Sequence, residues 1–141
     1  MLKLAHTLIS FVTLVTLVGS NLADWNNTHI FSELWPPHAH FHGAWFVIAI
    51  SLLSILCLWL IWSTGQVDRS RTAALIQGCI WLAFFPAMLV PDTALADPGK
   101  HLAQIAGIEL NLIGAVGQIL LLAIAFALLH GIRSQMASSM P

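Results

Sequence analysis

Charged residues are scarce in this chain of 141 residues, because lysine, arginine, aspartate and glutamate together make up only 8% of it. A soluble domain carries about 25% of such residues, whereas here 58% of the residues are hydrophobic and the mean hydropathy is +0.85. The five basic and six acidic residues form no basic stripe, which excludes nucleic acid as a partner. The composition therefore predicts an integral protein of the lipid bilayer.

Cysteine is equally scarce: Cys57 and Cys79 are the only two, and both fall inside apolar stretches. Thiols in such surroundings are small packing residues, so no disulfide framework is indicated. The sequence also lacks a CxxC pair, an HExxH pattern, a phosphate-binding loop, a dinucleotide fingerprint and a recognisable nucleophile triad. These absences argue against hydrolases of those types and against nicotinamide-dependent enzymes.

What the sequence does contain is four long apolar stretches, and a helix that crosses a bilayer needs about 20 such residues. They predict an all-α, polytopic membrane protein with a single domain, which is a bundle of four transmembrane helices. The first stretch also fits a cleavable signal peptide, although we expect an uncleaved anchor. Pro86 is expected to kink the third helix near its outer end. The stretches cover residues 2–19, 37–62, 72–90 and 101–132.

The basic residues near the membrane predict the orientation, because lysine and arginine are enriched at the cytoplasmic ends of spans. With four spans, four basic residues lie on one side and Lys100 alone lies on the other. Both termini are therefore expected in the cytoplasm. The loops 20–40 and 91–101 are expected on the non-cytoplasmic face of a bacterial inner membrane or an equivalent membrane. The four residues on the cytoplasmic side are Lys3, Arg69, Arg71 and Arg133.

Histidine is concentrated in the first outer loop, where four of the seven histidines fall within 14 residues. Proline suits the first turn of a helix, so the second helix is expected to begin at Pro36 or Pro37. His38 and His42 would then lie one turn apart on one face, with His40 about 160° away from each. If the segment is extended instead, all three histidines share one side.

Neutral imidazole is a good ligand for zinc, copper or iron, and the positive end of a helix dipole disfavours the charged imidazolium form. His38 and His42 are therefore suited to act as metal ligands or as bases. Four other residues are candidates to complete the site or to orient its rings. The alternative is structural, with the histidines capping and hydrogen-bonding the loop at the membrane interface. The candidates are Asp24, His29 and Glu33 from the loop and His101 from the start of the fourth helix.

The segment also resembles a group of small, largely uncharacterised four-helix membrane proteins of microbes. The resemblance covers about 20 residues and rests on the pattern D-W-N-x-T-H followed by W-P-P-H-A-x-F-H, which occurs here between Asp24 and His42. It implies that this segment is the site of the family. His40 falls at a variable position of the pattern, so the resemblance favours His29, His38 and His42 as the metal ligands.

Polar residues within the spans are the other candidates. Glu109 lies about seven residues into the fourth stretch, and a carboxylate inside a bilayer is costly and usually functional or paired. It is expected to serve as a ligand, proton acceptor or cation stabiliser, with pairing to another helix as the alternative. Small polar residues recur at regular spacing in the first and fourth stretches, which indicates helix packing. These are Thr7, Ser10, Thr13 and Thr16, and Gln104, Asn111 and Gln118 with Gly107 and Gly114.

Two functions fit these observations. The first is a membrane enzyme with an outward-facing site, an oxidoreductase or isomerase that acts on a lipophilic small molecule. In it His29, His38 and His42 hold a transition metal ion, with Glu109, His42 and Asp24 as acid/base groups. The second is a non-catalytic accessory subunit, which assembles with itself or with a larger membrane complex. A channel is disfavoured because the spans contain no ring of charges.

Overall fold

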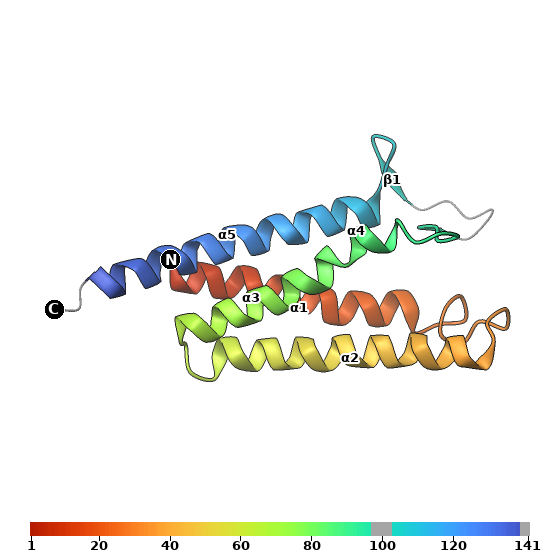
Figure 1. Cartoon of the computed structure of the whole chain (residues 1–141), viewed down its shortest axis with the longest axis horizontal. Helices are drawn as coiled ribbons and strands as arrows, with labels where there is room; N and C mark the ends of the chain where they lie inside the picture. The colour runs from red at the N-terminus through yellow and green to blue at the C-terminus, as the bar shows by residue number, and fades with distance from the viewer. Residues whose placement is uncertain (97–102, 139–141) are drawn as a thin grey trace.

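The computed structural model describes residues 1–96 and 103–138. Figure 1 shows long helices lying side by side, with the N-terminus and the C-terminal end of α5 at one end of the molecule. The all-α class predicted from the composition is confirmed. The elements are α1 (Leu2–Asp24), α2 (Pro37–Trp62), α3 (Val67–Leu82), α4 (Phe84–Ala87), β1 (Gln104–Ile105), β2 (Ile108–Glu109) and α5 (Leu110–Ser138).

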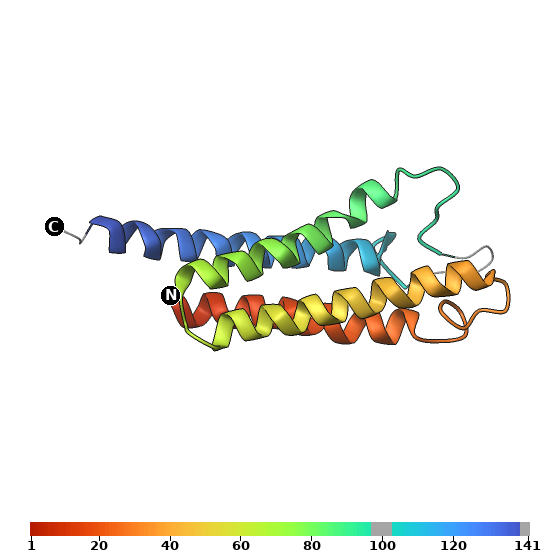
Figure 2. The ribbon, with the colours of Figure 1, turned by 60° about the horizontal axis from the view of Figure 1, so that its bottom comes forward.

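The four longer helices pack around a common core. α1 packs against α2 and α5, and α3 packs against the same two helices from the other side, an arrangement that Figure 2 shows from a second direction. Small side chains are fully buried where the helices meet, among them Ala5, Ala73 and Ala125. Such residues let helix backbones approach closely, which is how helices associate where lipid removes the usual hydrophobic driving force.

Three of these helices, α1, α2 and α5, are long and apolar enough to cross a membrane. Their outward faces carry large apolar side chains such as Leu52, Ile55 and Leu120, each more than half exposed. A surface of this kind is compatible with acyl chains and not with water. α3 has only 16 residues and carries Asp68 in its first turn, so by length it falls short of the about 20 residues that a span needs.

The first two predicted stretches each form one continuous helix, and the third is broken. α2 begins at Pro37, as the paired prolines indicated, while α1 continues beyond the predicted end at residue 19 to Asp24. α3 ends at Leu82, and the short α4, which contains Pro86, follows after Ala83. Proline has no N–H to donate and its ring clashes with the carbonyl group four residues earlier, which here is that of Leu82. The predicted kink therefore takes the form of a break.

The fourth predicted span starts too early. α5 begins at Leu110, and the residues before it form a hairpin in which Gln104 pairs with Glu109 and Ile105 with Ile108. Ala106 and Gly107 form the turn with φ of 53° and 78°, as a tight two-residue hairpin requires. The expected position of Glu109 within a span is therefore wrong, because this residue lies on β2 immediately before α5. Residues 101 and 102 lie outside the described residues.

The hairpin also divides the predicted polar seam of the fourth span. Gln104 lies on β1, whereas Asn111 and Gln118 lie on α5. Of these three, only Gln118 is buried among the helices. Of the three amide residues that were predicted to pack between helices, Gln118 of α5 is therefore the one that does so.

Candidate histidine site at the loop between α1 and α2

Asn26 organises the connection between α1 and α2. Its side-chain Nδ2 donates to the carbonyl oxygens of Leu22 and Ala23, at 3.3 and 2.7 Å, which satisfies the open C-terminal end of α1. Its Oδ1 accepts from the backbone N–H and the hydroxyl of Thr28, at 2.8 and 2.6 Å. One amide therefore ends the helix and folds the chain back over it.

His40 fastens the loop to α2. Its Nε2 lies 2.8 Å from the carbonyl oxygen of Ser32, and because a carbonyl can only accept, this nitrogen carries the proton. The ring also lies edge-on to Trp35, with the centroids 6.3 Å apart. His40 thus holds the loop in place, which agrees with its expected direction away from His38 and His42.

Gly43 lets the loop lie against α2. A Cβ atom at this position would meet the Trp35 ring at 3.0 Å and Ile30 at 3.4 Å. We expect Gly43→Val to displace Trp35 and to lower the free energy of unfolding by about 1 kcal/mol, at the lower end of overpacking costs because a loop side chain can shift. Thermal unfolding in detergent measures this change. Gly19→Val is the matched control, since nothing lies within 4 Å of that position, and an equal loss there would contradict the contact.

His38 and His42 form the closest histidine pair of the described residues. Their Nε2 atoms are 3.0 Å apart and their ring planes stand at 87°, as two residues one helical turn apart allow. In the neutral state one Nε2 donates its proton and the other accepts it. Both side chains are exposed, and Trp45 lies beside His42 with ring centroids 6.1 Å apart.

The separation of the two nitrogens suits a shared metal ion. Zinc binds imidazole nitrogen at about 2.0–2.1 Å, and two such bonds at about 90–110° place the nitrogens about 2.9–3.4 Å apart. The observed 3.0 Å falls within this range. A metal ion can therefore take the place of the shared proton once the two rings turn their Nε2 lone pairs toward it.

His29 belongs to a separate group. The Thr28 hydroxyl donates to Asn26 Oδ1, so its oxygen accepts the proton of His29 Nδ1 at 2.9 Å. This bond leaves Nε2 of His29 as the unprotonated nitrogen, 3.9 Å from Oδ1 of Asp24. Asp24 and His29 therefore face each other within the loop.

The predicted three-histidine site is not assembled. Among residues 1–96 and 103–138 no three side chains of the histidine, cysteine or carboxylate type come together as a metal site requires. His38 and His42 are together as predicted, whereas His29 lies with Asp24 in its own group. Glu33 is exposed, and His101 lies outside the described residues. Of the predicted ligands that the structure describes, His38 and His42 are the two whose ring nitrogens lie within hydrogen-bond distance of each other.

Sequence reasoning missed a buried polar network between α1, α2 and α3. The hydroxyl of Thr16 lies 2.9 Å from Oε1 of Gln77, whose Nε2 donates to Ser54 at 3.4 Å. Trp81 Nε1 donates to the Thr16 hydroxyl at 2.9 Å. Gln77 and Ser54 are fully buried. Thr16 therefore has the packing role that was predicted for the threonines of α1. The sequence signal for this network is Gln77, a single glutamine within an otherwise apolar stretch.

A second buried contact lies nearer the N-terminus. Nε2 of His6 is 2.8 Å from the hydroxyl of Ser70, and its ring lies edge-on to Trp62. Both residues of the hydrogen bond are buried. The contact joins α1 to the first turn of α3.

Comparison with known proteins places the chain in a family. Residues 8–137 match the family of unknown function DUF6640, and the chain belongs to this family. No curated protein and no solved structure matches the chain.

Proposed function

We propose that this member of the DUF6640 family crosses the membrane four times and binds a divalent transition metal ion through His38 and His42 on the non-cytoplasmic face. The third span is then α3 together with α4, which extends from Val67 to Ala87. Four crossings place both termini and the α2–α3 turn at the same membrane surface. They lie at one end of the molecule in Figure 1, and the positive-inside rule makes that end cytoplasmic because Lys3, Arg71 and Arg133 are there.

The approach of the two Nε2 atoms to 3.0 Å is the observation that carries the metal proposal. A bidentate histidine pair at one helical turn leaves the other coordination positions of zinc, copper or iron free for water or substrate. An open position is what distinguishes catalytic from structural metal sites. The exposed rings of Phe41 and Trp45 stack beside the pair and supply an apolar surface at the membrane interface, where a lipophilic molecule can approach from the bilayer.

The chemistry we propose is a redox reaction or an isomerisation of a lipophilic small molecule. His42 would hold the metal ion together with His38, and the metal ion would supply Lewis-acid or redox chemistry. Asp24 and His29 would exchange protons at a second point of the same loop. Glu109 lies on the hairpin before α5, at the end of the bundle that carries this loop (Figure 1). Because Glu109 precedes α5 and lies at the same end of the bundle as the loop, we include it as a third candidate acid/base group.

Removal of both imidazoles tests the metal site. We expect His38→Ala/His42→Ala to lower zinc affinity by more than about tenfold, because even the loss of a group that only orients a metal ligand typically costs about 10–100-fold. Elemental mass spectrometry of the detergent-purified protein measures bound zinc, copper and iron, and a zinc titration gives the affinity. The matched control is His130→Ala, which removes an exposed histidine from α5. Equal metal binding by the double variant and by this control would refute the site.

One observation favours the alternative of a non-catalytic accessory subunit. His29 and His40 both make contacts within the loop, to Thr28 and to Ser32 respectively, as a structural loop requires. An accessory subunit would copurify in constant ratio with a partner protein, or with itself as a homo-oligomer. It would also keep its cellular role in the His38→Ala/His42→Ala variant, whereas a metal-dependent enzyme would lose it.

A further inference from the structure

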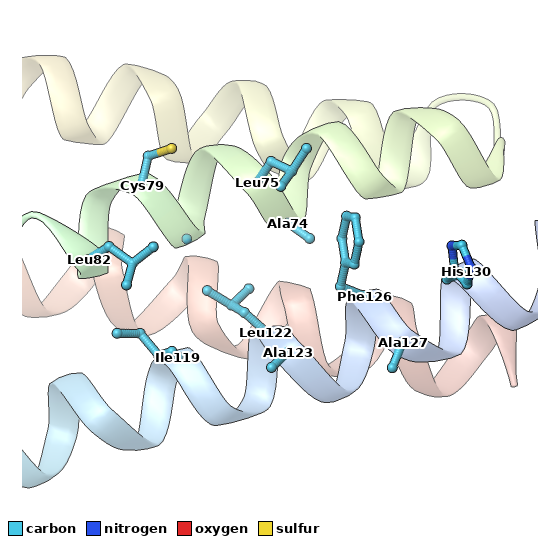
Figure 3. A pocket seen from close by; sticks show the side chains of 11 residues that line it. Ala74, Leu75, Cys79, Leu82, Ile119, Leu122, Ala123, Phe126, Ala127 and His130 are labelled. Atoms are coloured by element: carbon cyan, nitrogen blue, oxygen red, sulfur yellow. The ribbon is translucent and has the colours of Figure 1, made fainter.

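An apolar groove of about 510 Å³ lies between α3 and α5. This volume is within the range of about 300–1,000 Å³ that is usual for ligand pockets. Figure 3 shows its two walls facing each other, one row of side chains from each helix. Small residues on both walls keep it open, and at Gly78 a Cβ atom would meet nothing within 4 Å. The walls include Ala74, Gly78 and Leu82 of α3, and Leu122, Phe126 and His130 of α5.

The groove ends in positive charge. Arg71 precedes Ala74 by three residues, so it continues the α3 wall by one turn, and its guanidinium lies on the Phe126 ring at 4.9 Å. His130 closes the α5 wall, and Arg133 follows it by three residues. Arg71 has an exposed fraction of only 18%, and its Nε is buried without a hydrogen-bond partner among the described residues.

Asp68 does not neutralise this end. Its Oδ1 lies 3.7 Å from Nη1 of Arg71 and 3.4 Å from Nε of Arg133. One carboxylate thus faces two guanidinium groups, and it is itself 70% exposed. Ion pairs so open to solvent contribute little, so an anion of higher charge density can compete for the arginines. The remaining arginine of α3, Arg69, lies over Trp59 of α2, away from the groove.

The length of the groove matches one leaflet of a bilayer. From Arg71 to Leu82 and from Ile119 to His130 each wall covers 11 helical steps, or about 17 Å at 1.5 Å per residue. Half of the hydrocarbon core of a bilayer is about 15 Å. A partner helix would need a groove that continues through both leaflets, whereas the α3 wall stops where that helix ends, at Leu82.

We propose that this groove binds an anionic phospholipid, with one acyl chain between α3 and α5 and the phosphate at Arg71 and Arg133. Arginine binds phosphate through paired hydrogen bonds, and basic pockets between membrane helices recognise anionic headgroups. The site is separate from the histidine pair, because it lies at the opposite end of the bundle (Figure 1). The lipid-binding proposal therefore does not depend on whether the histidines bind a metal.

Native mass spectrometry of the detergent-purified protein, titrated with phosphatidylglycerol or phosphatidylcholine, tests the site. We expect phosphatidylglycerol to bind at least about fivefold more tightly, and Arg71→Gln or Arg133→Gln each to weaken it about fivefold, as one basic residue near an anionic headgroup does. Arg69→Gln is the matched control and should stay within about twofold. Arg133 is 58% exposed, so its variant reports on binding even where Arg71→Gln disturbs the fold.

The acyl-chain half of the site is tested by filling the groove. Gly78→Leu should weaken both lipids about tenfold, since each methylene displaced from an apolar site reduces binding, whereas Gly19→Leu, equally open on α1, should leave them unchanged. Equal binding of the two lipids to the wild type would overturn the proposal. So would displacement of the lipid by inorganic phosphate, or a change of oligomeric mass in Gly78→Leu, because these would identify a simple anion site or a contact between copies.

Discussion

Gln77→Ala is expected to lower the free energy of unfolding by about 2–5 kcal/mol, the range for emptying a fully buried long side chain. Gln77 is fully buried and joins Thr16 of α1 to Ser54 of α2. The substitution leaves a cavity and removes both contacts at once. Unfolding by sodium dodecyl sulfate in mixed micelles, followed by circular dichroism, measures the loss.

Gln77→Met separates the hydrogen bonds from the packing. Methionine keeps nearly the same volume, so only the polar contacts are lost, and we expect a cost of about 1 kcal/mol, because interhelical hydrogen bonds in membranes average about 0.6 kcal/mol. Thr16→Val in the same background should then add less than it does alone, since the two side chains share one contact. If methionine were as damaging as alanine, the network and not the volume would stabilise this part of the bundle.

Ala125→Leu is expected to cost about 2–3 kcal/mol, because extra carbon atoms in a filled core force helices apart. Ala125 is fully buried in the core where α5 meets its neighbours, with Leu122 and Leu129 on the same face of that helix. The same unfolding titration measures the effect. The matched control is Ala127→Leu on the same helix, whose side chain borders the open groove and should change stability by less than about 0.5 kcal/mol. Equal losses at the two positions would mean that α5 is not held by close packing.

The helix starts that the sequence predicted correctly are those marked by local chemistry. Proline at the first helical position defines α2 from Pro37 onward, and the spacing of His38 and His42 required only that a helix form there. The hairpin before α5 has no comparable signal. Each of its strands has only two residues, too few to show a strand pattern. Ala106 adopts a left-handed conformation that only a few per cent of non-glycine residues adopt.

The position of His29 depended on interactions that periodicity does not describe. The loop path is set by bonds between side chains and backbone, such as those of Asn26 and His40, and these direct His29 toward Asp24. The role of Gln77 was hidden for a related reason. Its partners Thr16 and Ser54 lie 61 and 23 residues away in the chain. The residues next to Gln77 in the sequence therefore give no indication of these hydrogen bonds.

The distribution of polar contacts has a consequence for how the protein is made. α1, α2 and α3 are linked by hydrogen bonds, including those of His6 to Ser70 and Thr16 to Gln77. α5 joins them through close apolar packing and the Asp68–Arg133 ion pair. If the chain crosses the membrane as proposed, these hydrogen bonds allow the first three helices to associate before α5 is synthesised. We therefore expect residues 1–96 and 103–141, supplied as two separate chains, to associate with each other in a membrane.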